Sequence, residues 1–161
     1  MLPAVLLAVD FDNFTYRVHP CMGNVPVPAV MRKGSFSYED KNMGAGFDLR
    51  VRSVQRGSLR AGTRQAVVVI VCDLPLGGGA EAYAFDERPS GAVLLGTIGS
   101  TGWGGDWGQG PASMRFRFAN HRLTAEQCAD NDCVRRKTTT YALRGTKLVT
   151  LSVAMRANLS R

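Results

Sequence analysis

The sequence predicts an all-β fold: a single-domain antiparallel sandwich, or a partly closed barrel, of about nine short strands. The stretch 65–74 holds five consecutive β-branched residues, from Val67 to Val71, which favour an extended backbone. Short segments that alternate apolar and polar residues recur along the chain, with Gly, Pro and Asn turns between them. No stretch of about ten residues carries a helical period.

A chain of 161 residues is long enough for one β domain, 1–161, that buries a core without a metal or a partner. Residues 1–8 are either the remnant of a secretory segment or a first strand. They are apolar, but a basic n-region is missing because the first arginine is Arg17. We therefore favour the strand. No apolar window is long enough for a membrane-spanning helix.

The first half of the chain predicts strands at the edge of the fold and one at its centre. Residues 9–18 form an edge strand or a turn, and Pro26 and Pro28 confine residues 25–30 to an edge or an extended connection. Residues 31–38 predict a hairpin about Lys33 and Gly34. Residues 47–54 alternate and predict a strand with one wet face. Residues 65–74 are apolar without alternation, so this strand should be covered on both faces.

The second half predicts five further strands, three loops and a turn at Asn120–Arg122. A flexible loop begins at Pro75 and includes Gly77 to Gly79, and one helical turn begins at Thr124. The remaining expected elements are strands at 81–85, 93–98 and 114–118, a Gly-rich loop at 101–111, a loop at 128–133, and a terminal hairpin of strands 137–143 and 147–153.

The net charge of +7 favours an anionic partner, although a basic surface also serves solubility alone. Arg50, Arg52, Arg115 and Arg117 lie on the wet faces of alternating strands. These four residues are the candidate basic face for nucleic acid or another polyanion.

The loop 99–110 is a candidate ligand site, because loops of this length in compact domains are often functional. Trp103 and Trp107 offer flat aromatic faces to a sugar ring, a base or an arginine, with Asp106 as a polar anchor. The alternative is that both indoles close the end of the β core.

Motifs for catalysis are sparse. The only imidazoles are His19 and His121, and the sequence contains no nucleophile elbow, no zinc-protease helix motif and no phosphate-binding loop before a helix. Asp10 with Asp12, or Asp130 with Asp132, would be the carboxylate pairs of a secreted hydrolase, which is the alternative function. We expect no cofactor and no metal.

Four features follow one another along the chain: the motif from Val9 to Tyr16, a cysteine, a Gly-turn hairpin and the run from Ala66 to Cys72. In this order they resemble the domain of LppP/LprE-type bacterial lipoproteins and related secreted proteins. The hairpin motif from Tyr141 to Gly145 fits as well. The resemblance covers roughly 9–150 and implies an extracytoplasmic location without an established chemistry. The family often has an acidic loop before the central strand. Here that loop, 55–64, has no carboxylate, so we expect no calcium there.

With this resemblance, two disulfides become the favoured state of Cys21, Cys72, Cys128 and Cys133. Cys128 and Cys133 would close a small loop, which leaves Cys21 with Cys72. Two alternatives remain. One is a zinc site that also uses the two histidines, and the other is a set of buried free thiols.

We therefore expect a non-catalytic extracytoplasmic β domain that binds an anionic or carbohydrate ligand or takes part in a protein assembly.

Overall fold

The computed structural model describes residues 8–18, 28–41, 44–74, 77–101, 114–129 and 133–157. Within these residues the chain forms eleven strands in three antiparallel sheets, none of which closes into a barrel, and one short 3-10 helix, η1 (Phe11–Asn13). The predicted all-β, sandwich-like fold is therefore confirmed. Among the described residues, no helix has the length and apolarity to cross a membrane.

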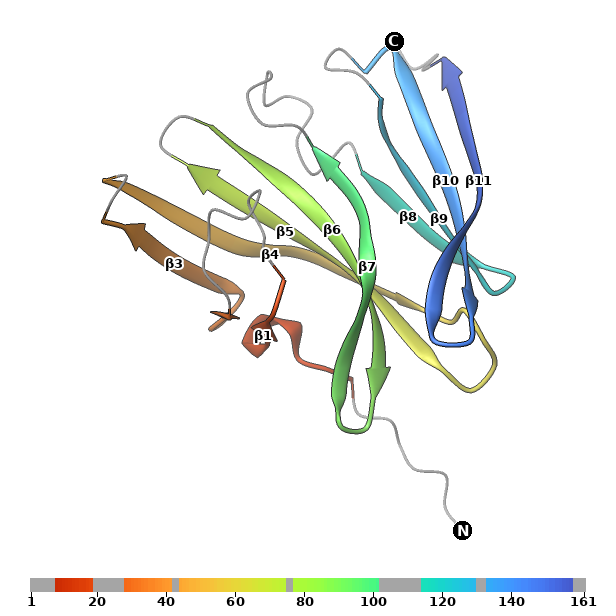
Figure 1. The fold of residues 1–161 in the computed structure, drawn as a ribbon, viewed down its shortest axis with the longest axis horizontal. Coiled ribbons are helices and arrows are strands. Elements are labelled where there is room, and N and C mark those ends of the chain that lie inside the picture. Colours follow the sequence, from red (N-terminus) through yellow and green to blue (C-terminus); the bar gives the residue numbers. More distant parts are fainter. Residues whose placement is uncertain are drawn as a thin grey trace.

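The largest sheet has five strands in the order β3-β4-β5-β6-β7 (Figure 1). Its strands are β3 (Ser35–Asp40), β4 (Ala45–Gly57), β5 (Arg64–Leu74), β6 (Gly77–Arg88) and β7 (Gly91–Thr101). Each strand pairs with its neighbour along the chain, as in a meander.

The second sheet has four strands in the order β11-β10-β9-β8. Its strands are β8 (Arg115–Ala119), β9 (Arg122–Cys128), β10 (Arg135–Arg144) and β11 (Lys147–Ala157). A third sheet pairs only β1 (Thr15–Tyr16) with β2 (Ala29–Val30).

The central strand β5 is covered on both faces, as its continuous apolarity predicts. Val68, Ile70 and Cys72 point into a core that includes Phe11 and Tyr16 of the N-terminal segment. Val67 and Val69 point the other way, into a core shared with the four-stranded sheet. The five-stranded sheet is thus the middle layer between the N-terminal segment and the four-stranded sheet.

Two predicted turns are confirmed by their backbone angles, but residues 31–38 form only an isolated bridge between Arg32 and Ser35, because β3 pairs with β4 instead. Lys33 and Gly34 have φ values of 50° and 78°, and Asn120 and His121 have values of 49° and 57°. Both pairs have the two positive φ values of the tight turns that connect antiparallel strands.

Several expected boundaries are wrong. Gly77 to Gly79 belong to β6 and pair with Leu74 to Cys72. Glycine has no side chain that would indicate a strand, but its backbone still pairs with the neighbouring strand. Thr124 lies within β9, where Leu123 and Ala125 are buried, rather than in a helical turn. The strands are also longer than expected, up to the 13 residues of β4. Residues 1–7 lie outside the described part of the chain, so their assignment is untested.

Candidate functional site

The four-stranded sheet has one apolar face and one polar face. Phe116, Phe118, Leu123 and Tyr141 pack into the core between the two larger sheets. Successive side chains of a strand point to opposite faces of the sheet. The residues next to these four along their strands therefore point away from the core. We call that side the outer face.

Seven basic residues lie on the outer face by strand register: Arg115, Arg117, Arg122, Arg136, Arg144, Lys147 and Arg156. A row of hydroxyl groups crosses the sheet between them. Thr124 lies opposite Arg117, Thr140 lies opposite Thr124, and Ser152 lies opposite Thr140. One line across four strands therefore presents an arginine followed by three hydroxyl side chains.

Positive charge is concentrated in this half of the protein. The described residues from 114 to 157 include nine lysines and arginines but only one carboxylate, that of Glu126. The described residues from 8 to 101 include ten lysines and arginines and nine carboxylates. All four ion pairs found within the described residues join side chains of residues 8–101. Almost the whole net charge of the described chain therefore belongs to the four-stranded sheet.

Like charges face each other on the outer face. Arg136 lies directly opposite Arg156, and Arg144 lies opposite Lys147. Like charges in directly opposed strand positions are destabilising.

The four arginines predicted as a basic face lie on two different sheets. Arg115 and Arg117 are exposed on β8, at one edge of the outer face. Arg50 and Arg52 are exposed on β4 of the five-stranded sheet. Arg50 is engaged in an ion pair with Asp73, and Arg52 is the extra residue of a bulge between Val51 and Ser53. Only the β8 pair therefore belongs to the charge-rich sheet.

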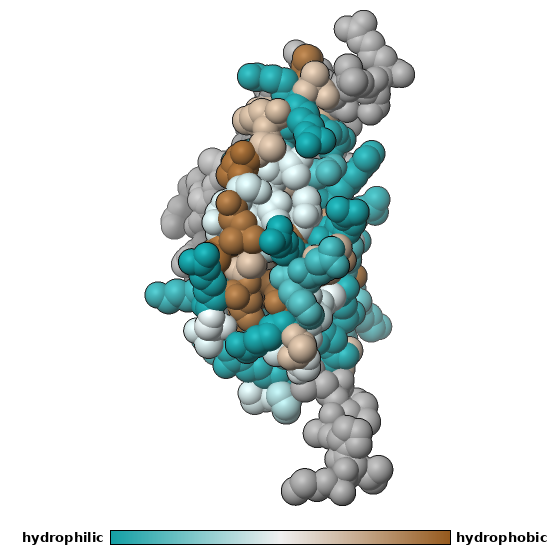
Figure 2. Space-filling view, turned by 90° about the vertical axis from the view of Figure 1, so that its right-hand side faces the viewer, coloured by the Kyte–Doolittle hydropathy of each residue, from teal (hydrophilic) through white to brown (hydrophobic). Residues whose placement is uncertain are grey.

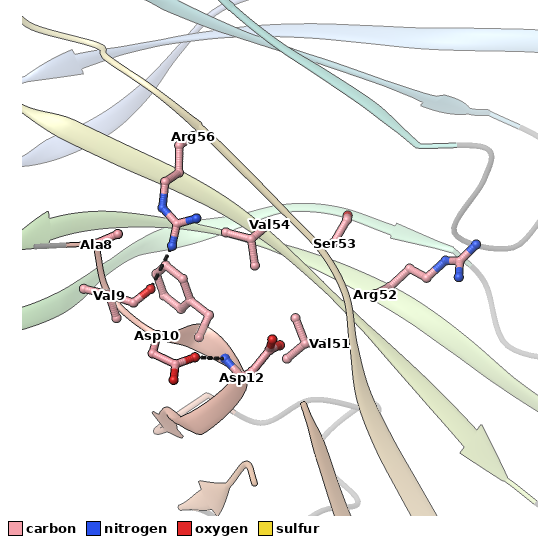
Figure 3. A pocket seen from close by; sticks show the side chains of 10 residues that line it. Ala8, Val9, Asp10, Asp12, Val51, Arg52, Ser53, Val54 and Arg56 are labelled. Atoms are coloured by element: carbon pink, nitrogen blue, oxygen red, sulfur yellow. Dashed lines mark hydrogen bonds between the residues drawn. The ribbon is translucent and has the colours of Figure 1, made fainter. Parts of the chain in front are cut away.

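A pocket of about 550 Å³ lies where the N-terminal segment crosses β4 (Figure 3). The guanidinium of Arg56 donates a 2.7 Å hydrogen bond to the carbonyl oxygen of Val9 and lies 5.7 Å from the ring centroid of Phe11. Arg52 extends away from the other labelled residues. The pocket thus lies at the contact of the N-terminal segment with the sheet.

Two predicted carboxylates, Asp10 and Asp12, line this pocket. The Asp10 carboxylate accepts a 2.7 Å hydrogen bond from the side chain of Asn13 and a 3.2 Å bond from the backbone N–H of Asp12. The Asn13 hydrogen bond, above all, holds the pKa of Asp10 below its ordinary value. A general acid needs a raised pKa, so the arrangement at Asp10 does not suit that role. Asp130 and Asp132 lie outside the described residues.

A buried carboxylate, Glu87, connects the N-terminal segment to the five-stranded sheet. Its side chain is fully buried, with Oε2 at 2.9 Å from Nε of Arg64 and 3.3 Å from Nε of Arg56. Its Oε1 accepts a 2.8 Å hydrogen bond from the backbone N–H of Val9. This group is structural, because two arginines and a backbone donor surround it.

The cysteine prediction is confirmed for one bond. Cys128 and Cys133 form a disulfide that joins the end of β9 to the residues before β10. No cysteine in the described residues is free, and Cys72 is fully buried on β5. The predicted partner Cys21 lies outside the described residues, as do Trp103, Asp106 and Trp107 of the tryptophan loop.

Sequence reasoning missed five basic residues of the outer face: Arg122, Arg136, Arg144, Lys147 and Arg156. They are far apart in the sequence and belong to three strands, and only the register places them on the same face as Arg117. The available signal was the scarcity of carboxylates after residue 113.

Among the described residues, no three His, Cys, Asp or Glu side chains come together as metal ligands would. No family model, curated protein or solved structure matches this chain.

Proposed function

We propose that this protein is a non-catalytic, extracytoplasmic binding domain, and that the outer face of its four-stranded sheet binds an anionic polysaccharide. The observation that carries the proposal is the ratio of nine basic residues to one carboxylate in the described part of that sheet. Clustered positive charge attracts polyanions and accelerates their association. The Cys128–Cys133 disulfide is compatible with an oxidising compartment.

A polysaccharide accounts for the outer face better than single-stranded nucleic acid does. Proteins that bind single strands stack the bases on aromatic side chains. Phe116, Phe118 and Tyr141 of this sheet point into the core instead. The outer face presents hydroxyl groups between arginines, and hydroxyls both donate to and accept from sugar hydroxyls. Arginine in turn binds sulfate, phosphate or carboxylate groups in a bidentate manner.

Elution from immobilised heparin, a sulfated polysaccharide, tests this proposal. We expect the double variant Arg115→Ala with Arg117→Ala to elute at a lower salt concentration than the parent. The matched control is Arg32→Ala with Lys41→Ala, which removes the same charge from exposed positions of the other half.

Equal retention of the two double variants would show that net charge, not the outer face, controls binding. Competition with polyglutamate, duplex DNA and single-stranded DNA separates the ligand classes. Displacement by DNA at lower concentrations than by soluble heparin would overturn the choice of polysaccharide.

A further inference from the structure

The strand β11 forms an edge of the four-stranded sheet that lacks the usual protection against further pairing. In the described part of the chain, only β10 pairs with it. Natural edge strands are blunted by charges, prolines, bulges or short length. β11 has eleven residues, and the run from Leu148 to Met155 contains neither a charge nor a proline.

The other three edges of the two larger sheets are better protected. β3 ends with Glu39 and Asp40, and β8 is short and carries Arg115 and Arg117. β7 has no charge, but its pairing register with β6 shifts twice. β11 has a single shift, at Leu151, after which its ladder with β10 runs unbroken from Ser152 to Ala157.

The apolar side chains of this unbroken segment are exposed. Val153 and Met155 are each 56% exposed, and Leu151 is 40% exposed. In Figure 1 the ribbons of the two larger sheets diverge towards the end of β11. Figure 2 shows apolar side chains at the surface on this side of the molecule, beside hydrophilic ones.

We propose that β11 binds an extended acidic segment of another protein, which adds as a fifth strand to the four-stranded sheet. Strand addition satisfies the backbone groups of an edge, and alternate side chains provide the specificity. In this segment Val153 and Met155 point to the core side, and Arg156 points to the outer face. The matching partner strand alternates apolar residues with glutamate or aspartate.

Charge decides between this partner and a second copy of the chain. Pairing of two β11 strands would bring together two sheets that each contain nine basic residues and one carboxylate. Like-charge juxtaposition at an interface opposes association. An acidic strand instead gains attraction from Arg156, which points to the outer face.

Binding of synthetic hexapeptides to the full chain, measured by fluorescence anisotropy, tests the proposal. The probe alternates glutamate with valine, and the matched peptide has lysine in place of glutamate. We expect only the acidic peptide to bind. Val153→Glu should weaken binding about tenfold, because its carboxylate would lie on the core side against the apolar residues of the partner strand. Val93→Glu, at a 44% exposed position on the edge strand β7, is the control and should change binding less than about twofold.

Three results would overturn the proposal. One is equal binding of the lysine peptide, and another is equal loss of binding in the Val153 and Val93 variants. The third is a dimer of the parent protein in light scattering that becomes a monomer on Val153→Glu, because a second copy would then occupy β11. The double variant Arg115→Ala with Arg117→Ala should still bind the peptide, since β8 lies at the opposite edge of the sheet. Polysaccharide binding is thus tested separately.

Discussion

The backbone N–H of Val9 donates a 2.8 Å hydrogen bond to the buried carboxylate of Glu87, 78 residues further along the chain. The same carboxylate pairs with Arg56 and Arg64. Arg56 in turn donates to the carbonyl oxygen of Val9. The N-terminal segment is therefore held on the middle layer by a closed set of polar contacts above the aromatic core.

Glu87→Gln should lower the free energy of unfolding by about 1–3 kcal/mol, because it leaves partly buried arginines without their counter-charge. Denaturation in urea measures this. The control is Asp73→Asn, which removes an exposed carboxylate paired with Arg50 and should cost about 0–1 kcal/mol. Equal losses in the two variants would contradict the structural role of Glu87.

Alkaline pH should destabilise the protein. Burial raises the pKa of the Tyr16, Tyr83 and Tyr141 phenols above the ordinary value, and at Tyr83 a hydrogen bond to Glu81 adds to the effect. A raised folded-state pKa means that the folded chain holds the proton longer. This stabilisation is complete below about pH 10, the unfolded pKa, and is lost as the pH rises above it. Phenolate absorbance should rise together with unfolding. Ionisation of all the tyrosines at pH 10 without unfolding would contradict this.

Val69→Asp should prevent folding. Val69 is 3% exposed in the core between the two larger sheets, and an unpaired buried charge costs several kcal/mol, comparable with the total stability of a domain. Circular dichroism of this variant and of Val93→Asp, whose site is 44% exposed, gives the comparison. A folded Val69→Asp protein would show that β5 is not the central strand.

The contact between Gly57 and Phe118 should tolerate no side chain at position 57. A Cβ at Gly57 would lie 2.1 Å from Cγ of Phe118, whereas a Cβ at Gly46 would meet nothing within 4 Å. Gly57→Ala should cost about 1–3 kcal/mol or more, and Gly46→Ala much less. The cost at Gly57 should shrink in a Phe118→Gly background, which removes both the ring and the Phe118 Cβ that would lie 2.3 Å away. An additive double-mutant cycle would rule out the direct clash.

The fold could be predicted from the sequence because β signals are local. The β-branched run of β5 and the turns at Lys33–Gly34 and Asn120–His121 act over a few residues, and all are confirmed. The division into two larger sheets could not be predicted, since it depends on contacts such as Gly57 with Phe118 across 61 positions. For the same reason the alternation alone wrongly places Arg50 and Arg117 on one basic face.

The candidate site was predicted only in part. Alternation placed Arg115 and Arg117 on a wet face, but Arg136, Arg144 and Arg156 join them through the register of β10 and β11. Glu87 lies in a strand where sequence gives no sign that a carboxylate is buried. Its partners Val9 and Arg56 come from distant parts of the chain.

The salt dependence of heparin binding is the most direct test of the outer face as a polyanion site. Titration calorimetry at a series of salt concentrations gives the slope of log K against log salt. We predict a steep negative slope whose magnitude falls by about one for each arginine removed in the Arg115→Ala and Arg117→Ala variants. A slope near zero, or one unchanged by these variants, would contradict the account.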